Sequence, residues 1–288
     1  MAEIRRSPRV RDYIVEIDWA TVGTDGGPTC RDIVAHFEAG DFILLNNVPL
    51  RVDYDLLNRI TVPALDGARK LSYKAFLYPK LWQSHHRRLL YRTFGLNLAD
   101  YWRFRNQVRR LNAQVHGLTR QIFPTYRFVK EQFSWRFLPT DLGVHPLHID
   151  AYGSNDDIQY VRFFVNLDRE PRVWKISHRL EEVAEQVYRR EGWSRHAGAT
   201  ANEFCRVAGR YCLDLAEPDC HEVSFAQGDV WLCDTRKISH GVVSGHRMMA
   251  THFWADPQGM HDPSKRIDQV VQNIHARYAD GDVKAAAV

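Results

Sequence analysis

The sequence predicts a mainly β fold with flanking helices, and three observations support this. Between residues 125 and 256, most segments are short, rich in aromatic and β-branched residues, and separated by turn signals. Helical periodicity is concentrated before and after this region, over residues 78–124 and 264–278. No repeat or low-complexity linker divides the chain, so we expect one domain over residues 1–288.

The part of the chain before residue 125 predicts both strands and helices. "DYIVEIDW" alternates apolar and polar residues as a strand does, and "RDIVAHFEAGDFILLNNVPL" predicts a short helix, a Gly-Asp turn and a second strand. Leucine and aromatic residues then recur at helical spacing and indicate two helices broken near Gly95. Asn97 or Asp100 is expected to cap the second helix, and Pro124 to end it.

The β region begins with four predicted strands, in "YRFVKEQFSWRFLP", "HPLHIDAYG", "IQYVRFFVNLD" and "RVWKIS". A helix over residues 179–191 interrupts the series. "CHEVSFAQGDVWLCD", "KISHGVVSG" and "RMMATHFWAD" return to β structure, with a tight turn at Gly228 and Asp229. An amphipathic helix over residues 264–278 follows, and we expect the last residues, "GDVKAAAV", to be a frayed tail.

The overall charge indicates a small-molecule partner. The formal net charge of +4 suits an anionic small substrate, but the basic residues are too scattered to indicate a nucleic-acid surface. Between residues 86 and 130 the arginines alternate with core-type residues at helical spacing, which predicts a solvated helix face. We expect contact with an anionic membrane surface only if the substrate is a lipid.

The cysteines and the N-terminus indicate a cytoplasmic protein. The five cysteines include no CxxC pair, and their odd number argues against a disulfide framework. The N-terminus has no apolar signal-like segment, and no apolar run of 18 residues occurs, so we expect no integral membrane segment.

One short motif, His148-Ile149-Asp150, carries the chemistry. On a strand, His148 and Asp150 point to the same face because side chains alternate with a period of two. Two such groups on a core-facing strand need a partner, which is either a mutual hydrogen bond or a metal. Ferrous oxygenases use two histidines and one carboxylate on one face of the metal. His240 is our choice for the second histidine, because it follows the Gly-Asp hairpin and lies among small residues. His252 is the competitor.

Three blocks of the sequence resemble successive motifs of the 3-deoxy-D-manno-oct-2-ulosonic acid (Kdo) hydroxylases: "LHIDAYGS", "VRFFVNLDREPRVWKIS" and "VSFAQGDVWLCDTRKISHGVVSG". Their order and spacing agree over residues 130–255, and "KLSYKAF" and "FPTYRF" upstream resemble the family more loosely. These hydroxylases belong to the iron(II)- and 2-oxoglutarate-dependent oxygenases. The resemblance implies a double-stranded β-helix (jelly-roll, cupin-like) core over residues 125–256, with iron(II), 2-oxoglutarate and O₂ as cofactors and co-substrates.

The same resemblance implies His148, Asp150 and His240 as the iron ligands, the three residues already chosen from the pattern. Halogenating relatives replace the carboxylate with a small residue, so Asp150 indicates hydroxylation or another oxidation. The resemblance favours a Kdo-type sugar acid as substrate. The segment over residues 178–220 does not look close to the family and is expected at the substrate mouth, so an amino acid or a natural-product intermediate is the alternative substrate. A cupin-like binding protein without catalytic activity is the remaining alternative.

The far carboxylate of 2-oxoglutarate needs a cation, and arginine fits because its planar fork pairs two oxygens. Many relatives carry this arginine on the strand after the distal histidine, where this chain has Thr251 and His252, with Arg247 nearby. Arg162 is the preferred anchor over Arg247, because it lies on the predicted strand after the HxD motif. Asn166, on the same strand face, is expected to hydrogen-bond the iron-chelating end.

Three further residues are expected at the substrate. Arg136 follows two aromatic residues on the strand that leads to the site, Tyr152 lies two residues after Asp150, and Trp174 falls within the second family-like block. An exposed strand arginine and a core tryptophan are the alternative interpretations of Arg136 and Trp174.

Overall fold

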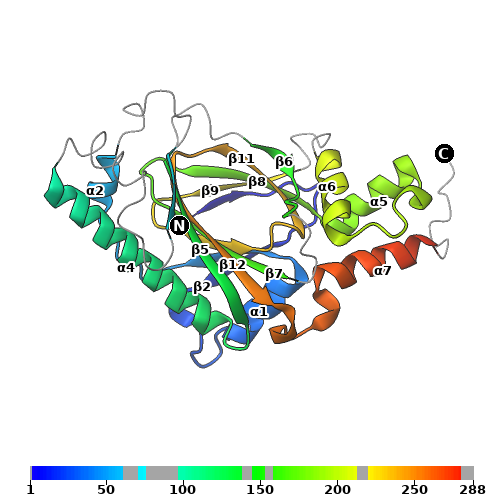
Figure 1. Cartoon of the computed structure of the whole chain (residues 1–288), viewed down its shortest axis with the longest axis horizontal. Helices are drawn as coiled ribbons and strands as arrows, with labels where there is room; N and C mark the ends of the chain where they lie inside the picture. Colours follow the sequence, from blue (N-terminus) through cyan, green and yellow to red (C-terminus); the bar gives the residue numbers. More distant parts are fainter. Residues whose placement is uncertain are drawn as a thin grey trace.

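Two β-sheets face each other in the computed structural model, with helices on one outer face and at one end (Figure 1). The structure describes residues 2–60, 71–75, 97–137, 145–152, 158–212 and 220–279. The first of the two helices predicted within residues 78–124 and the predicted C-terminal tail lie outside the described residues.

The larger sheet has seven strands in the order β2-β3-β10-β7-β12-β5-β4. Only β2 and β3 pair in parallel, and every other pair is antiparallel. The strands are β2 (Ile14–Asp18), β3 (Phe42–Asn46), β4 (Leu71–Ala75), β5 (Arg127–Phe137), β7 (Gln159–Asn166), β10 (Val230–Cys233) and β12 (Arg247–Asp256).

The smaller sheet has five strands in the order β1-β9-β8-β11-β6, all antiparallel. They are β1 (Glu3–Arg5), β6 (His145–His148), β8 (Arg172–Arg179), β9 (His221–Phe225) and β11 (Ile238–Ser244). The chain crosses between the sheets repeatedly, so β7, β10 and β12 lie in one and β6, β8, β9 and β11 in the other. This is a jelly roll, and it confirms the predicted double-stranded β-helix core with flanking helices.

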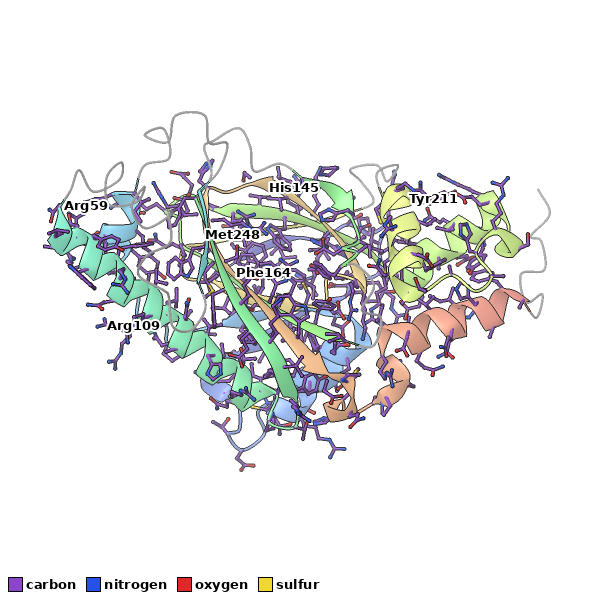
Figure 2. All side chains as sticks on the ribbon, in the orientation of Figure 1. Arg59, Arg109, His145, Phe164, Tyr211 and Met248 are labelled. Atoms are coloured by element: carbon purple, nitrogen blue, oxygen red, sulfur yellow. The ribbon has the colours of Figure 1, made fainter. Side chains whose placement is uncertain are left out.

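Side chains of alternating direction separate two apolar cores. On β7, Val161, Phe163 and Val165 face the outer helices, whereas Phe164 packs between the sheets. The inter-sheet core includes a stack of Phe225 on Trp231, with ring centroids 3.8 Å apart. Figure 2 shows Phe164 in this interior. The alternation places one face of every core strand towards the cavity described below.

Helices α1 (Cys30–Ala39), α2 (Tyr54–Asn58) and α4 (Leu98–Ile122) cover the larger sheet. The capping prediction for α4 is confirmed, because the Asn97 side chain accepts from the backbone N–H of Asp100 and the helix ends before Pro124. The outward face of α4 carries exposed arginines such as Arg109, which points away from the molecule in Figure 2. Helix α1 ends at Gly40, whose φ of 86° is left-handed, as the predicted Gly-Asp turn requires.

Helices α5 (Leu180–Glu191), α6 (Ala201–Tyr211) and α7 (Ile267–Ala279) pack together beside β6 (Figure 1). Their apolar core includes Leu147 and Ile149 of the HxD segment. Helix α6 was not predicted. Short 3₁₀ turns complete the described structure at Trp19–Thr21, Trp193–Arg195, Pro257–Gly259 and Pro263–Lys265.

Candidate metal centre and its cavity

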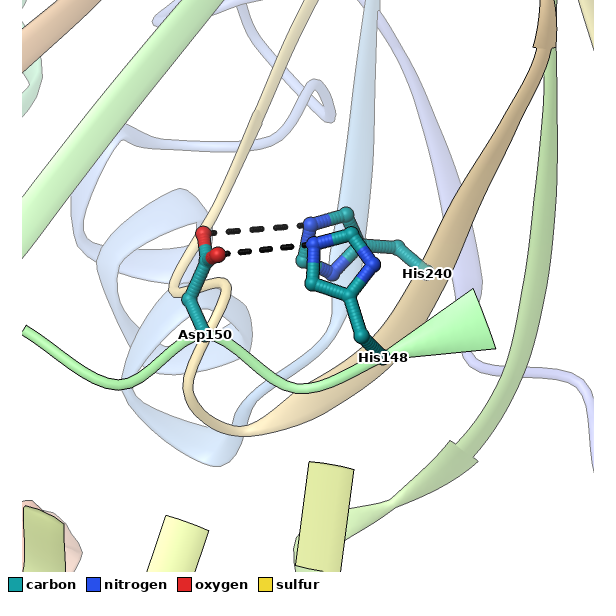
Figure 3. A group of neighbouring side chains, drawn as sticks. All are labelled: His148, Asp150 and His240. Carbon is teal, nitrogen blue, oxygen red and sulfur yellow. Dashed lines mark ion pairs between the residues drawn. The ribbon is translucent and has the colours of Figure 1, made fainter. Parts of the chain in front are cut away.

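The structure brings together His148, Asp150 and His240 (Figure 3). His148 ends β6 and lies directly opposite His240 on β11, and Asp150 follows two residues later. The Nε2 atom of His148 is 3.4 Å from Oδ1 of Asp150, and that of His240 is 3.9 Å from Oδ2. One candidate ligand atom from each residue lies within 4.8 Å of the other two. The alternative histidine, His252, lies instead against the ring of Tyr152.

Backbone carbonyl groups fix both imidazoles with Nε2 towards the carboxylate. The Nδ1 atom of His148 is 2.8 Å from the carbonyl oxygen of Pro146, and that of His240 is 3.2 Å from the carbonyl oxygen of Ile238. In a neutral imidazole, donation by Nδ1–H leaves the lone pair on Nε2, which is the arrangement usual for metal-bound histidine.

The protonation states also suit metal binding. Burial lowers the pKa of His240 to about 4. Burial disfavours the charged form of His148 too, but the hydrogen bond and negative charge of Asp150 outweigh it and raise the pKa of His148. Burial opposes ionisation of Asp150, yet the hydrogen bond from His148 and the charge of Arg162 hold the Asp150 pKa well below its ordinary value. Asp150 is therefore ionised and His240 neutral at pH 7, as metal ligands must be.

The Asp150 carboxylate receives further hydrogen bonds at Oδ2. The Tyr152 hydroxyl donates to this oxygen, and Arg162 Nη1 donates to it over 2.7 Å. Thr235 Oγ1 lies 2.8 Å from the Tyr152 hydroxyl and 3.2 Å from Arg162 Nη1. The backbone N–H of Asp150 donates to the Thr235 carbonyl over 2.9 Å, so both the backbone and the side chain of Asp150 are held in place.

A cavity of about 260 Å³ opens beside the His–Asp–His cluster. It lies between the two sheets, and its wall contains the three cluster residues, apolar and aromatic side chains, and three arginines. The lining residues are Arg136, His145, His148, Asp150, Arg162, Phe164, Arg172, Trp174, His240, Val242 and Met248. Figure 2 labels His145, Phe164 and Met248 around this part of the interior.

Two of the cavity arginines lack a carboxylate partner within the described residues. Arg172 is 2 % exposed, its Nη1 donates to the Gly245 carbonyl over 3.1 Å, and its Nε is buried without a hydrogen bond in the described structure. Burial and the charge of Arg136 lower the pKa of Arg172. Burial and the charge of Arg162 similarly lower the pKa of Arg136. These unfavourable positive charges would be relieved by an anionic ligand.

Arg247 and Asn166 do not line the cavity. Arg247 pairs with the buried Asp168 over 2.9 Å and donates to the carbonyl of Ile60 over 3.2 Å. The amide of Asn166 donates to the Phe225 carbonyl over 2.9 Å, and its oxygen accepts from the backbone of Asp168. Both side chains hold loops together at this end of the sheets.

Of the other residues predicted from the sequence, some line the cavity and one contacts a candidate metal ligand. Arg136 and Trp174 line the cavity. Tyr152 does not; its hydroxyl contacts Asp150 and its ring packs 4.7 Å from that of Tyr160. Helices α5 and α6 contribute no lining residue in the described part of the chain, so the expected place of this segment at the substrate mouth finds no support there.

Sequence reasoning missed Arg172 and Thr235. Arg172 is two residues before Trp174 on β8 and therefore shares its face, a signal that was present in "RVW". Thr235 had no such signal, because it reaches Tyr152 across 83 positions of sequence.

The residues present fit a divalent transition metal. Two imidazole Nε2 atoms and one ionised carboxylate, all close together at a cavity wall, form the ligand set typical of non-haem iron(II) oxygenases.

A scan against protein-family models gives no match, and a search of the curated proteins finds no relative. The jelly roll with this ligand set defines a double-stranded β-helix with a candidate metal centre between its sheets. Among solved structures, this chain is similar to the Kdo hydroxylase KdoO, described as a non-heme Fe(II) alphaketoglutarate dependent dioxygenase.

The apo structure of KdoO has a TM-score of 0.64 to this chain at 15% sequence identity, and the match covers 92% of this chain and 96% of KdoO. Its cobalt(II) complex gives 0.64 at 16% identity, with 91% and 95% covered. Its complex with alphaketoglutarate and Fe(III) gives 0.63 at 16%, with 90% and 95% covered. The resemblance seen in the sequence motifs is confirmed, and the shared fold spans nearly the whole chain.

In the described part of the chain, no helix combines the length and apolar character that crossing a bilayer requires.

Proposed function

We propose that this protein is an iron(II)- and 2-oxoglutarate-dependent dioxygenase that oxidises, most simply by hydroxylation, a C–H bond of a small polar substrate. The observation that carries the proposal is the convergence of His148, Asp150 and His240, with both Nε2 atoms directed at the carboxylate, at the wall of a cavity of about 260 Å³. The fold shared with KdoO supports it.

The two histidines and Asp150 would hold the metal. Iron(II) bound with 2-oxoglutarate would supply the activation of O₂ for attack on a C–H bond. The residues of the chain bind and orient the ligands, and the apolar part of the wall, Phe164, Val242 and Met248, keeps water away from the reacting groups.

The cavity arginines are the proposed partners of the far carboxylate of 2-oxoglutarate. Arg162, the anchor preferred from sequence, already donates through Nη1 to Asp150, whereas Arg247 pairs with Asp168 outside the cavity. Arg172 and Arg136 have no carboxylate partner in the described structure. They are therefore better placed than Arg162 or Arg247 to pair with the far carboxylate of 2-oxoglutarate. Arg162 Nη1 would remain on Asp150.

The proposed substrate is a sugar acid of the Kdo type. One carboxylate, Asp150, faces three guanidinium groups in the cavity wall, so the wall favours a second acid group in addition to the co-substrate. The motif resemblance to the Kdo hydroxylases points to the same chemistry.

Anaerobic titration of the apoprotein with iron(II) and 2-oxoglutarate tests the function, with the visible charge-transfer band of the chelate as readout. We expect the band in the wild-type protein and its loss in His148→Ala and His240→Ala. His252→Ala is the matched control and should keep the band. A folded wild-type protein without the band would contradict the proposal.

A further inference from the structure

Two side chains, Tyr152 and Arg162, donate to one oxygen of Asp150, and a third, Thr235, contacts both of them. Arg162 Nη1 donates to Oδ2 over 2.7 Å, so this oxygen is an acceptor, and the Tyr152 hydroxyl gives its single proton to it. The hydroxyl of Thr235, 2.8 Å away, must then donate to the phenol oxygen. The order Thr235 to Tyr152 to Asp150 forms a hydrogen-bond chain in which each bond polarises the next.

Arg162 contacts both Asp150 and Thr235 in this arrangement. Its Nη1 donates to Oδ2 over 2.7 Å and lies 3.2 Å from the Thr235 hydroxyl. The guanidinium is buried and fixed over the ring of Phe164, 4.8 Å from its centroid. A cation at this point stabilises the ionised form of the carboxylate.

The loop that carries Thr235 is itself rigid. Asp234 before it is fully buried, pairs with Arg236 over 3.2 Å and accepts from the Gln159 amide over 2.8 Å. Arg236 lies over the ring of Tyr160, 4.4 Å from its centroid. Thr235 is therefore held in place independently of any ligand in the cavity.

We propose that Tyr152, Thr235 and Arg162 are positioning residues: Tyr152 and Arg162 occupy Oδ2 of Asp150, Thr235 holds the Tyr152 hydroxyl, and Oδ1 is thereby presented to the metal. Oδ1 is the oxygen 3.4 Å from His148 Nε2, and neither Tyr152 nor Arg162 donates to it in the described structure. We call the hydrogen bonds of Tyr152, Thr235 and Arg162 around Oδ2 the clamp. This inference rests on the proposed metal centre and replaces the substrate-contact role that the sequence suggested for Tyr152.

Cobalt(II) is the probe for this proposal, because its visible spectrum reports the ligands around it without turnover. Tyr152→Phe keeps the ring and removes the hydroxyl, and we expect its cobalt(II) affinity to fall by about 10–100-fold, with a changed spectrum. Tyr126→Phe is the matched control. It removes a buried hydroxyl that donates to a carboxylate, Glu38, over 2.6 Å outside the cluster, and it should leave affinity and spectrum unchanged.

A second pair of variants separates the hydrogen-bond chain from packing. Thr235→Val should weaken cobalt(II) binding and change the spectrum, and Thr235→Ser, which keeps the hydroxyl, should restore both. Wild-type affinity and spectrum in both Tyr152→Phe and Thr235→Val would overturn the clamp and leave the metal centre standing. Absence of cobalt(II) binding by the wild-type protein would overturn the proposed function, and the clamp with it.

Discussion

The imidazole of His240 stacks on the indole of Trp174, with ring centroids 5.4 Å apart and planes 21° from parallel. The same indole lines the cavity, and its Nε1 is buried without a hydrogen-bond partner in the described structure. Trp174 therefore fixes the orientation of a candidate metal ligand and carries a donor that the described protein groups do not use.

Substitutions of Trp174 should separate these two roles. Trp174→Phe keeps an aromatic ring against His240, so we expect near wild-type cobalt(II) affinity but weaker binding of a ligand that uses Nε1–H. Trp174→Leu removes the stacking and should lower cobalt(II) affinity by about 10-fold. Trp135→Phe is the control, because Trp135 lies in the other apolar core, where its Nε1 donates to Asn112 over 3.0 Å. Equal metal affinity in all three variants would disprove the orienting role.

Arg172 and Arg247 should respond in opposite ways to substitution by methionine. Arg172→Met removes a buried charge without a carboxylate partner, so the free energy of unfolding should not fall, while 2-oxoglutarate affinity should drop by about 10–100-fold because a charge-assisted pair is lost. Arg247→Met leaves Asp168 buried and unpaired, at a cost of about 3–5 kcal/mol of stability.

Urea unfolding and co-substrate titration measure the two effects. The assignment fails if Arg247→Met loses 2-oxoglutarate binding and Arg172→Met keeps it. Arg162→Met, run in parallel, should lower cobalt(II) affinity as well, because its Nη1 contacts Asp150.

Gly209 of α6 should be sensitive to a single methyl group. A Cβ at this position would lie 2.9 Å from the carbonyl oxygen of Ile149, between the two residues of the HxD motif. Gly209→Ala must displace that strand, so we expect a stability loss of about 1–3 kcal/mol and weaker metal binding.

Gly117 of α4 provides the matched control, because a Cβ there meets nothing within 4 Å. Gly117→Ala should raise stability by about 0.5–1 kcal/mol and leave metal affinity unchanged. Thermal unfolding and cobalt(II) titration distinguish the two. Unchanged metal affinity in Gly209→Ala would show that α6 does not set the position of the HxD strand.

At pH values low enough for His148 to be protonated, metal binding should release a proton, and that proton comes from His148. Asp150 raises the pKa of His148 above its ordinary value, whereas burial lowers that of His240 to about 4. Near neutral pH, metal therefore competes with a proton on His148 and not on His240, and affinity declines as pH falls through the His148 pKa. Calorimetric titration in buffers of different ionisation enthalpy measures the proton count. A constant count of zero down to pH 5 would contradict it.

Local sequence rules predicted most of the fold because the elements carry strong local signals. Asn97 and Pro124 bound α4 as expected, and the Gly-Asp turn follows α1. Helix α6 was not predicted from the sequence, although Thr200 and Glu203 of the segment "TANE" form a capping box. Its "ANEFCRVAGRY" mixes small and polar residues, so its helical character depends on packing against α5 and α7.

The residue types and spacing of the HxD motif and His240 identified the cluster, although two of the structural expectations behind it were wrong. Strand β6 ends at His148, so Asp150 lies just beyond the strand, and β9 and β10, predicted as a hairpin about Gly228 and Asp229, lie in different sheets because the chain crosses between the sheets at this turn. The arginines of the cavity were harder to predict. The sequence shows which residues share a strand face, but it does not show which strands lie next to each other in the fold. Arg162, Arg172 and Arg136 come from β7, β8 and β5, and only the closed barrel brings them together. Thr235 illustrates the same limit, because its role depends on a loop crossing to the end of another strand.

His148 of the HxD motif ends a short edge strand, β6, and Asp150 follows just beyond it. Strand β6 has four residues and, among the described strands, pairs with β11 alone, at the edge of its sheet. Such an edge can open locally while the seven-stranded sheet stays intact. Metal could therefore load and leave by a brief opening of this edge, without global unfolding. A bound ion would connect β6 to β11. Amide hydrogen exchange and proteolysis at residues 145–150 would therefore slow on metal binding. Amide hydrogen exchange in β7 and β12 would scarcely change.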